Sequence, residues 1–191
     1  MMKELEERIK ADGIVEAGDV LKVGSFLNHQ IDPFLLKTMA QEWHELYKND
    51  KVDKILTIEA SGIAMASFAA YEFGVPLLFA KKSKTSNISD NVYSTEVFSY
   101  THNKMNHVQV EKRFLKEGEN VLIIDDFLAR GEALKGLIDL CRQAGANVVG
   151  CGIAIEKAFQ PGGSDLRAAG CRVESLARIK SMNQQNGIEF C

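Results

Sequence analysis

The sequence VLIIDDFLARGEA, residues 121–133, decides the fold of this chain. Four apolar residues lead into the adjacent acids Asp125 and Asp126, and a short turn containing Gly131 follows them. The run GEALKGLIDLCRQAGA that begins in this turn is helix-like. An apolar strand, a turn and a helix in this order indicate a buried strand of an α/β sheet, with the two acids at its carboxyl end.

The turn after the two acids is suited to binding an anion. Backbone N–H groups at a helix start lack partners within the helix, and the helix dipole is positive there. The neighbouring carboxylates suit hydroxyl groups, so the sequence predicts a ligand with a phosphate and a cis-diol, which is a phosphorylated ribose. The alternative is that the acids only cap the next helix, as Asp does well. Two acids followed by a glycine turn favour the ligand.

Helical and strand-like segments alternate on both sides of this stretch. The alternation predicts one α/β domain over residues 1–191, with a mostly parallel, twisted sheet flanked by helices. Asp32-Pro33 is a helix start, with Asp as the cap and Pro at the first helical position. Expected helices lie at 3–11, after Pro33, from 62 to 73, after 131 and near 164–169. Expected strands lie at 20–23, 54–59, 75–80, 121–126, 147–156 and 172–176.

Residues 83–120 differ from the rest of the chain in character. Ser83 to Asp90 is polar and turn-like, and the stretches Tyr93–Tyr100 and Val108–Leu115 alternate as strands do. Between them lies the polar tip THNKMNH. We expect a long mobile hairpin over about residues 83–118.

Composition limits the classes of function. The 191 residues are 46% hydrophobic and 26% charged, which is typical of a soluble globular domain, and the net charge of −3 argues against non-specific nucleic-acid binding. No apolar run is long enough to span a membrane, and the charged start MMKELEERIK is unlike a signal peptide. The widely spaced cysteines at 141, 151, 171 and 191 suggest neither zinc nor a redox dithiol. We expect a cytoplasmic protein that binds neither nucleic acid nor membrane.

The quoted stretch resembles the motif that binds phosphoribosyl pyrophosphate (PRPP) in type I phosphoribosyltransferases. The resemblance implies that the catalytic acids Asp125 and Asp126 hold the ribose hydroxyls, while the loop around Gly131 wraps the 5′-phosphate. The residues of that loop are Ala129, Arg130, Gly131, Glu132 and Ala133. Arg130, Glu132 and Ala133 depart from the residues common in the family, and the missing Thr hydroxyl at 133 leaves the phosphate to backbone N–H groups.

Two further turns fit the same resemblance. Ser61 and Gly62 also end a strand and open a helix, where the family holds pyrophosphate, although an ordinary strand–helix turn is the alternative. Lys81, followed by a second lysine, would neutralise pyrophosphate in this subunit or in the partner of a dimer, unless the pair is simply solvated. Ser99 and Tyr100 would belong to a loop that closes over bound substrates, or Tyr100 is a half-exposed strand aromatic.

Other residues suit a purine base. Lys157 can donate to a purine carbonyl oxygen, Phe159 can stack on the ring, and Asn28 can pair with a base edge. Leu21 can supply an apolar wall. Each also has an ordinary interpretation: Asn28 as a turn residue, Leu21 as core and Lys157 as surface.

Five segments extend the resemblance over nearly the whole chain: LKVGSFLNHQIDP (21–33), IEASGIA (58–64), IIDDFLA (123–129), IEKAFQPG (155–162) and RVESLARIKS (172–181). Together they resemble the bacterial purine-salvage group of this family that uses xanthine. The resemblance implies Leu21, Asn28 and Lys157 as xanthine contacts, and a small hood from about residues 14–30 and 157–191. It also implies Mg²⁺ carried by PRPP without a dedicated protein metal site, and a homodimer.

Two alternatives stay open at this stage. Bacterial purine repressors, which sense PRPP without catalysis, share nearly the same Asp-Asp stretch, but they carry an extra DNA-binding module for which we see no room here. The second alternative is the same enzyme class acting on guanine or hypoxanthine in place of xanthine. The pocket around Asn28 would decide the choice of base, because a buried polar group left unpaired by the wrong base is costly.

Overall fold

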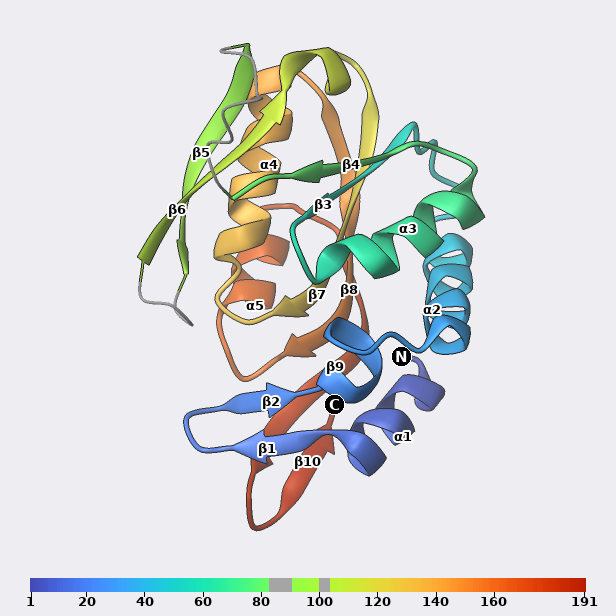
Figure 1. Ribbon diagram of the computed structural model, residues 1–191, viewed down its shortest axis with the longest axis vertical. Helices are drawn as coiled ribbons and strands as arrows, with labels where there is room; N and C mark the ends of the chain where they lie inside the picture. The colour runs from blue at the N-terminus through green and yellow to red at the C-terminus, as the bar shows by residue number, and fades with distance from the viewer. Residues whose placement is uncertain (83–90, 100–103) are drawn as a thin grey trace.

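In a computed structural model, which describes residues 1–82, 91–99 and 104–191, the chain forms a central sheet of six strands with helices on both faces (Figure 1). The strand order is β10-β9-β8-β7-β3-β4, and only β10 runs antiparallel to its neighbour. The predicted α/β fold is confirmed. The strands are β3 (Lys54–Ile58), β4 (Leu77–Ala80), β7 (Asn120–Leu128), β8 (Asn147–Lys157), β9 (Val173–Asn183) and β10 (Gly187–Phe190).

Strand β7 lies inside the sheet because its side chains are apolar on both faces. Leu122 and Ile124 pack into one hydrophobic cluster with α1, α2 and α3, while Val121 and Ile123 pack into a second cluster with α4 and α5. This is the expected pattern for a parallel strand covered on both sides. The helices are α1 (Lys3–Asp12), α2 (Pro33–Leu46), α3 (Gly62–Phe73), α4 (Glu132–Ala144) and α5 (Gly162–Ala168).

The helix signals in the sequence are confirmed. The Asp32 carboxylate accepts hydrogen bonds from the backbone N–H groups of Phe34 at 3.1 Å and Leu35 at 3.2 Å, with Pro33 opening α2. Gly74 ends α3 in the left-handed conformation, with a φ of 67°. In the described part of the chain, the helices lack the length and apolar character that a membrane crossing requires.

Several elements were not predicted, or were predicted too short. Strand β7 continues to Leu128, beyond the expected end at residue 126, so the two acids are not its last residues. Strands β1 (Ile14–Glu16) and β2 (Val20–Lys22) pair with each other, and a π-helical turn, Gly24–Asn28, follows them. Strand β9 runs on to Asn183 because β10 pairs with its second half. These extensions depend on partners elsewhere in the chain, which local sequence patterns do not show.

The expected hairpin exists as β5 (Val92–Ser99) and β6 (Lys104–Glu111), but the second strand was predicted wrongly at 108–115. Residues 104–107 of the expected tip belong to the ladder, and a 3₁₀ turn, Lys112–Phe114, follows it. The hairpin packs on α4, where Gln143 Nε2 donates to the Ser94 carbonyl at 2.9 Å. Tyr100 and the rest of 83–90 and 100–103 lie outside the described residues.

Candidate active site

The acid pair lies near the carboxyl end of β7, and its two members differ in exposure. Asp126 is half-buried, and its carboxylate accepts from the Phe127 N–H at 2.9 Å and from Asn28 Nδ2 at 3.3 Å. Asp125 is only 4% exposed, and its Oδ1 accepts from the Asp126 N–H at 3.0 Å. Burial, and then the charge of Asp126, raise the pKa of Asp125 well above its usual value. Asp126 is therefore the acid that is open to a ligand.

The raised pKa of Asp125 predicts a pH-dependent stability. Between the unfolded and the folded pKa values, the native chain holds a proton that the unfolded chain releases, so stability falls as the pH rises. We expect Asp125→Asn to raise the Tm of the free protein at pH 7, by about 2–4 °C for each kcal/mol recovered. The gain should shrink toward pH 4, which thermal melts between pH 4 and 8 can measure. A Tm difference that does not vary with pH would contradict this assignment.

The turn between β3 and α3 lies directly against Asp125. A Cβ atom placed on Gly62 would lie 2.2 Å from Thr57 Oγ1 and 3.4 Å from Asp125 Oδ1, so only glycine fits there without rearrangement. The Glu59–Ala60 peptide bond just before this turn is cis. Because Ser61 is adjacent to Gly62, the structure brings this predicted turn and the acid pair to one place.

A cavity of about 610 Å³ contains the loop that was predicted to hold phosphate. It is lined by Gly18, Asp19, Val20, Phe127, Ala129, Arg130, Gly131, Glu132, Ala133, Leu134, Lys157 and Gln160. Within the described part of the chain, no side-chain cap is present at the start of α4, where the N-cap residue is Gly131, so the first-turn N–H groups are suited to a ligand or to solvent. The Glu132 carboxylate pairs with Lys135 at 2.9 Å, which offsets part of the negative charge that it would present to an anion.

Gly131 holds this loop in a conformation that other residues rarely adopt. Its φ is 82°, and a Cβ atom there would lie 3.3 Å from the Cα of Gly162 at the start of α5. The Gly162 N–H donates to the Ala129 carbonyl at 3.0 Å. The glycines of the FQPGG segment, residues 159–163, thus allow the close contact between the start of α5 and the loop.

Lys157 connects the cavity to the turn between β1 and β2. Its Nζ donates to the Asp19 carbonyl at 2.6 Å and lies 5.6 Å from the centre of the Phe127 ring. Burial lowers the pKa of this lysine. Lys157 is held at the end of β8 beside Glu156, which is 1% exposed and accepts from both terminal nitrogens of Arg167, at 2.7 and 2.8 Å.

The other predicted base contacts, Asn28, Leu21 and Phe159, do not line the cavity directly. Asn28 ends the π-helical turn and reaches Asp126, whereas Leu21 is buried in β2, next to the cavity-lining Val20. Phe159 is 39% exposed and is not among the residues that line the cavity. The aromatic ring that lines the cavity is that of Phe127. Phe127 was not predicted as a site residue, although it directly follows the two acids.

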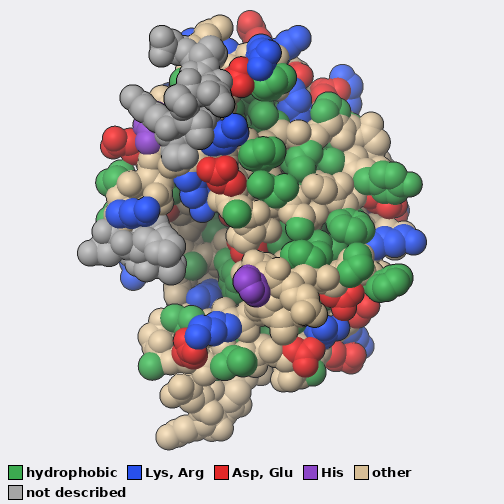
Figure 2. Space-filling model, viewed as in Figure 1, with side chains coloured by type: hydrophobic (Ala, Val, Ile, Leu, Met, Phe, Trp, Pro, Cys, Tyr) green, Lys and Arg blue, Asp and Glu red, His purple; other side chains and the backbone are tan. Residues whose placement is uncertain are grey.

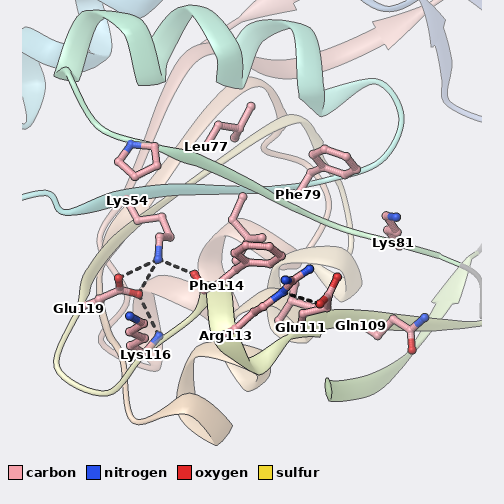
Figure 3. A pocket seen from close by; sticks show the side chains of 13 residues that line it. Lys54, Leu77, Phe79, Lys81, Gln109, Glu111, Arg113, Phe114, Lys116 and Glu119 are labelled. Atoms are coloured by element: carbon pink, nitrogen blue, oxygen red, sulfur yellow. Dashed lines mark hydrogen bonds and ion pairs between the residues drawn. The ribbon is translucent and has the colours of Figure 1, made fainter. Parts of the chain in front are cut away.

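Lys81 and Lys82, the two lysines that follow β4, have different surroundings. The positive charge of Lys82 opposes the rise in the pKa of Asp125, and the Lys82 backbone N–H donates to the Glu59 carboxylate at 2.6 Å. Lys81 instead lines a second cavity of about 480 Å³ at the β4 edge of the sheet, which is also lined by Phe79 and Phe114 (Figure 3). Lys81 is not among the residues that line the cavity of the phosphate loop, so within the described residues it lies apart from that loop and from Lys157.

Comparison with known proteins agrees with this geometry. Residues 22–174 match the model of the phosphoribosyl transferase domain. The xanthine phosphoribosyltransferase of Bifidobacterium adolescentis is 56% identical, over 99% of this chain and 99% of its own length. The xanthine phosphoribosyltransferase of Finegoldia magna is 52% identical, over 98% of both chains.

Solved structures with low sequence identity share the fold. The Giardia lamblia APRTase complexed with 9-deazaadenine has a TM-score of 0.78 at 22% identity, covering 93% of this chain and 98% of that one. The adenine phosphoribosyltransferase of Thermoanaerobacter pseudethanolicus has a TM-score of 0.74 at 21% identity, covering 91% and 99%. With the domain model matching most of its length and the sequence relatives nearly all of it, the chain belongs to the phosphoribosyltransferase family, among the xanthine phosphoribosyltransferases.

Proposed function

We propose that this protein transfers the 5-phosphoribosyl group of PRPP to xanthine, giving xanthosine 5′-monophosphate and pyrophosphate, a reaction of purine salvage. The observation that carries the proposal is the cavity that joins the uncapped start of α4 to Lys157. Because the loop at the start of α4 and Lys157 line the same cavity, it supports an anion site and a base site side by side. The relatives named for xanthine support the choice of base.

The phosphate and sugar occupy the end of the cavity near α4 in this proposal. The N–H groups of residues 130–133 bind the 5′-phosphate, with the helix dipole adding to the attraction. Asp126 accepts hydrogen bonds from the ribose hydroxyls. Asp125 accepts a hydrogen bond from the backbone N–H of Asp126 and so orients Asp126. Because Asp125 lies beneath the Gly62 turn, it reaches the sugar only when that turn moves.

The base occupies the other end. Lys157 donates to a carbonyl oxygen of xanthine in place of the Asp19 carbonyl, and Phe127 stacks on the ring. Asn28 reads the base edge, and Leu21 supports the wall behind Val20. This arrangement aligns the base nitrogen with C1 of the ribose.

The displacement at C1 passes through a transition state with oxocarbenium character and needs no covalent nucleophile. The protein contributes alignment of base and sugar, stabilisation of the departing pyrophosphate and exclusion of water. Ser61 and Gly62 provide the turn for pyrophosphate, and Lys82 provides positive charge beside it. Asp126 supplies negative charge near the cationic ring.

Mg²⁺ enters the site with PRPP in this proposal. Among the described residues there is no group of three or more His, Cys, Asp or Glu side chains that could hold a metal ion. Mg²⁺ commonly keeps several waters and binds through substrate phosphates with one or two carboxylates, and the half-exposed Asp126 suits that role. The ion would neutralise charge on the pyrophosphate oxygens.

A rate comparison with xanthine, guanine and hypoxanthine, each with PRPP and Mg²⁺, tests the function. We expect xanthine to give the highest kcat/KM. Turnover of guanine or hypoxanthine at a higher rate would reassign the base and keep the enzyme class. No turnover of any base, together with PRPP binding by calorimetry, would support a non-catalytic PRPP sensor.

Replacing Gly131 with Ala should weaken PRPP binding. A Cβ atom strains the left-handed conformation by about 1–3 kcal/mol and presses on Gly162, so the loop should open. We expect KM for PRPP to rise about tenfold or more. The matched control is Gly118→Ala, which has a similar φ of 75° but nothing within 4 Å of the new Cβ. An equal rise in KM in both variants would contradict a specific role of the loop.

The domain organisation follows from the same proposal. Residues of about 14–30 and 157–191 act as the hood over the base, because the β1–β2 turn and Lys157 meet above the cavity. The hairpin of about 83–118, which includes Ser99 and Tyr100, acts as the segment that closes over bound substrates. We also propose a cytoplasmic location for this purine-salvage reaction.

We also propose a homodimer, with α3 and the β4 edge in the interface. Phe34 of α2 and Tyr71 of α3 are 81% and 86% exposed, and Figure 2 shows hydrophobic side chains gathered over this face. Lys81 at the same edge would then face the partner subunit. We expect Tyr71→Asp to shift the mass in light scattering from dimer to monomer, while Met105→Asp on β6 should not. A monomeric wild-type protein would refute the proposal.

A further inference from the structure

The fold brings two cysteines into contact that are far apart in the sequence. Cys151 is fully buried in β8, and Cys171 lies half-buried just before β9, with the two Sγ atoms 3.7 Å apart. The parallel pairing of β8 and β9 causes this contact, since the Cys151 N–H donates to the Arg172 carbonyl at 2.8 Å. Sequence spacing suggested no redox dithiol, because it does not show strand pairing.

We propose that Cys151 and Cys171 are a redox modification site that forms a reversible disulfide with a peroxide as oxidant. The Cys171 thiolate attacks one peroxide oxygen, giving a sulfenic acid and releasing water or hydroxide. The Cys151 sulfur then attacks the sulfenic sulfur, and the oxygen of the sulfenic acid leaves as water. Each sulfur loses one electron, the peroxide gains two, and the two thiol protons end in water.

The geometry permits this bond with small movements. A disulfide is about 2.05 Å long, so the two sulfurs must approach by about 1.7 Å from their present contact. Cys171 can move, because it lies in the connection between α5 and β9 and not within either element. Cys151 is fixed by the strand on both sides.

The surroundings assign the two thiols different roles. The hydrogen bond with Cys151, and then the positive charge of Arg167, lower the pKa of Cys171. That same hydrogen bond, and then burial, raise the pKa of Cys151. Since the thiolate is the nucleophile, the more exposed Cys171 reacts first and Cys151 resolves the intermediate.

The disulfide would close a loop that includes part of the cavity wall. Residues 151–171 contain Lys157 and Gln160, which line the cavity, and Gly162, which packs on Gly131. The bond should therefore restrict the segment that positions these groups. We expect the oxidised protein to show a Tm higher by about 5 °C or more, and slower amide exchange over 157–170.

The test uses the full chain carrying Cys191→Ser, which removes the exposed thiol that could join two chains. After brief treatment with hydrogen peroxide, two of the three remaining thiols should be lost in a thiol titration under denaturing conditions. Peptide mapping without reductant should link Cys151 to Cys171, and dithiothreitol should restore both thiols. The Tm rise should appear and disappear with the bond.

Two matched variants separate this pair from the other thiols. Adding Cys141→Ser should leave the disulfide unchanged, because that buried thiol takes no part. Adding Cys171→Ser should abolish the disulfide and the Tm rise, while the reduced melts of all variants report folding. Oxidation of Cys171 to sulfinic acid with a free Cys151 thiol, or a bond involving Cys141, would overturn the proposal.

Discussion

Replacing Asp126 with Asn is expected to lower kcat/KM for PRPP by about 100-fold and to leave the fold intact. Hydrogen bonds to a charged acceptor contribute about 1.5–3 kcal/mol, and 100-fold corresponds to about 2.7 kcal/mol. The substitution also removes negative charge beside the developing cationic sugar. The fold should survive because an Asn at 126 can still accept from the Phe127 N–H, as Asp126 does at 2.9 Å.

The matched control for this variant is Asp50→Asn. Asp50 forms an ion pair with Arg172 that is partly exposed to solvent, away from the carboxyl edge of the sheet. Its loss should change stability slightly and kcat/KM by less than about twofold. Near wild-type turnover of Asp126→Asn with an unchanged Tm would remove the acid from the reaction. A collapse of the Tm would instead assign it a structural role.

Lys157→Met is expected to lower kcat/KM for xanthine by about 10- to 100-fold while changing PRPP affinity by less than about twofold. Methionine keeps most of the length and the apolar contact with Phe127 but removes the only donor of this side chain. The carbonyl oxygen of the bound base would then lose its partner, which costs about 1–3 kcal/mol. Steady-state kinetics for the base and calorimetry for PRPP separate the two effects.

Lys157 also holds the β1–β2 turn through the Asp19 carbonyl, so a control must distinguish loosening of that turn from loss of the base contact. Lys51→Met removes an exposed lysine paired with Asp53, and it should change neither parameter. An equal loss of xanthine use and PRPP binding in Lys157→Met would show that the lysine supports the whole cavity. It would then not be a contact specific to the base.

The central part of the site could be predicted from residues 121–133 alone. A continuous run of apolar side chains indicates a strand buried on both faces, and a parallel strand followed by a helix places its carboxyl end beside the helix start. Asp126 and the Gly131 loop followed from that local pattern. The Ser61–Gly62 turn followed because the carboxyl ends of parallel strands share one edge of the sheet.

Exposure within the acid pair could not be predicted. Both carboxylates occur in the same motif, yet Asp125 is covered by the Gly62 turn and Asp126 is open. The covering turn is more than 60 residues away in the sequence. The choice between Phe127 and Phe159 has a similar origin, because Phe159 lies beyond the end of β8 and is not among the residues that line the cavity.

The sequence by itself determined the α/β class, the apolar central strand, the acid pair and the glycine turn, because each depends on neighbouring residues and on the periodicity of a strand or helix. Only the tertiary structure decided the contact of Asn28 with Asp126, the assignment of Lys82 to the acid pair and Lys81 to the sheet edge, and the meeting of Cys151 with Cys171. These depend on which strands pair and on how loops pack across the sheet, and such non-local contacts leave no periodic signal in the chain.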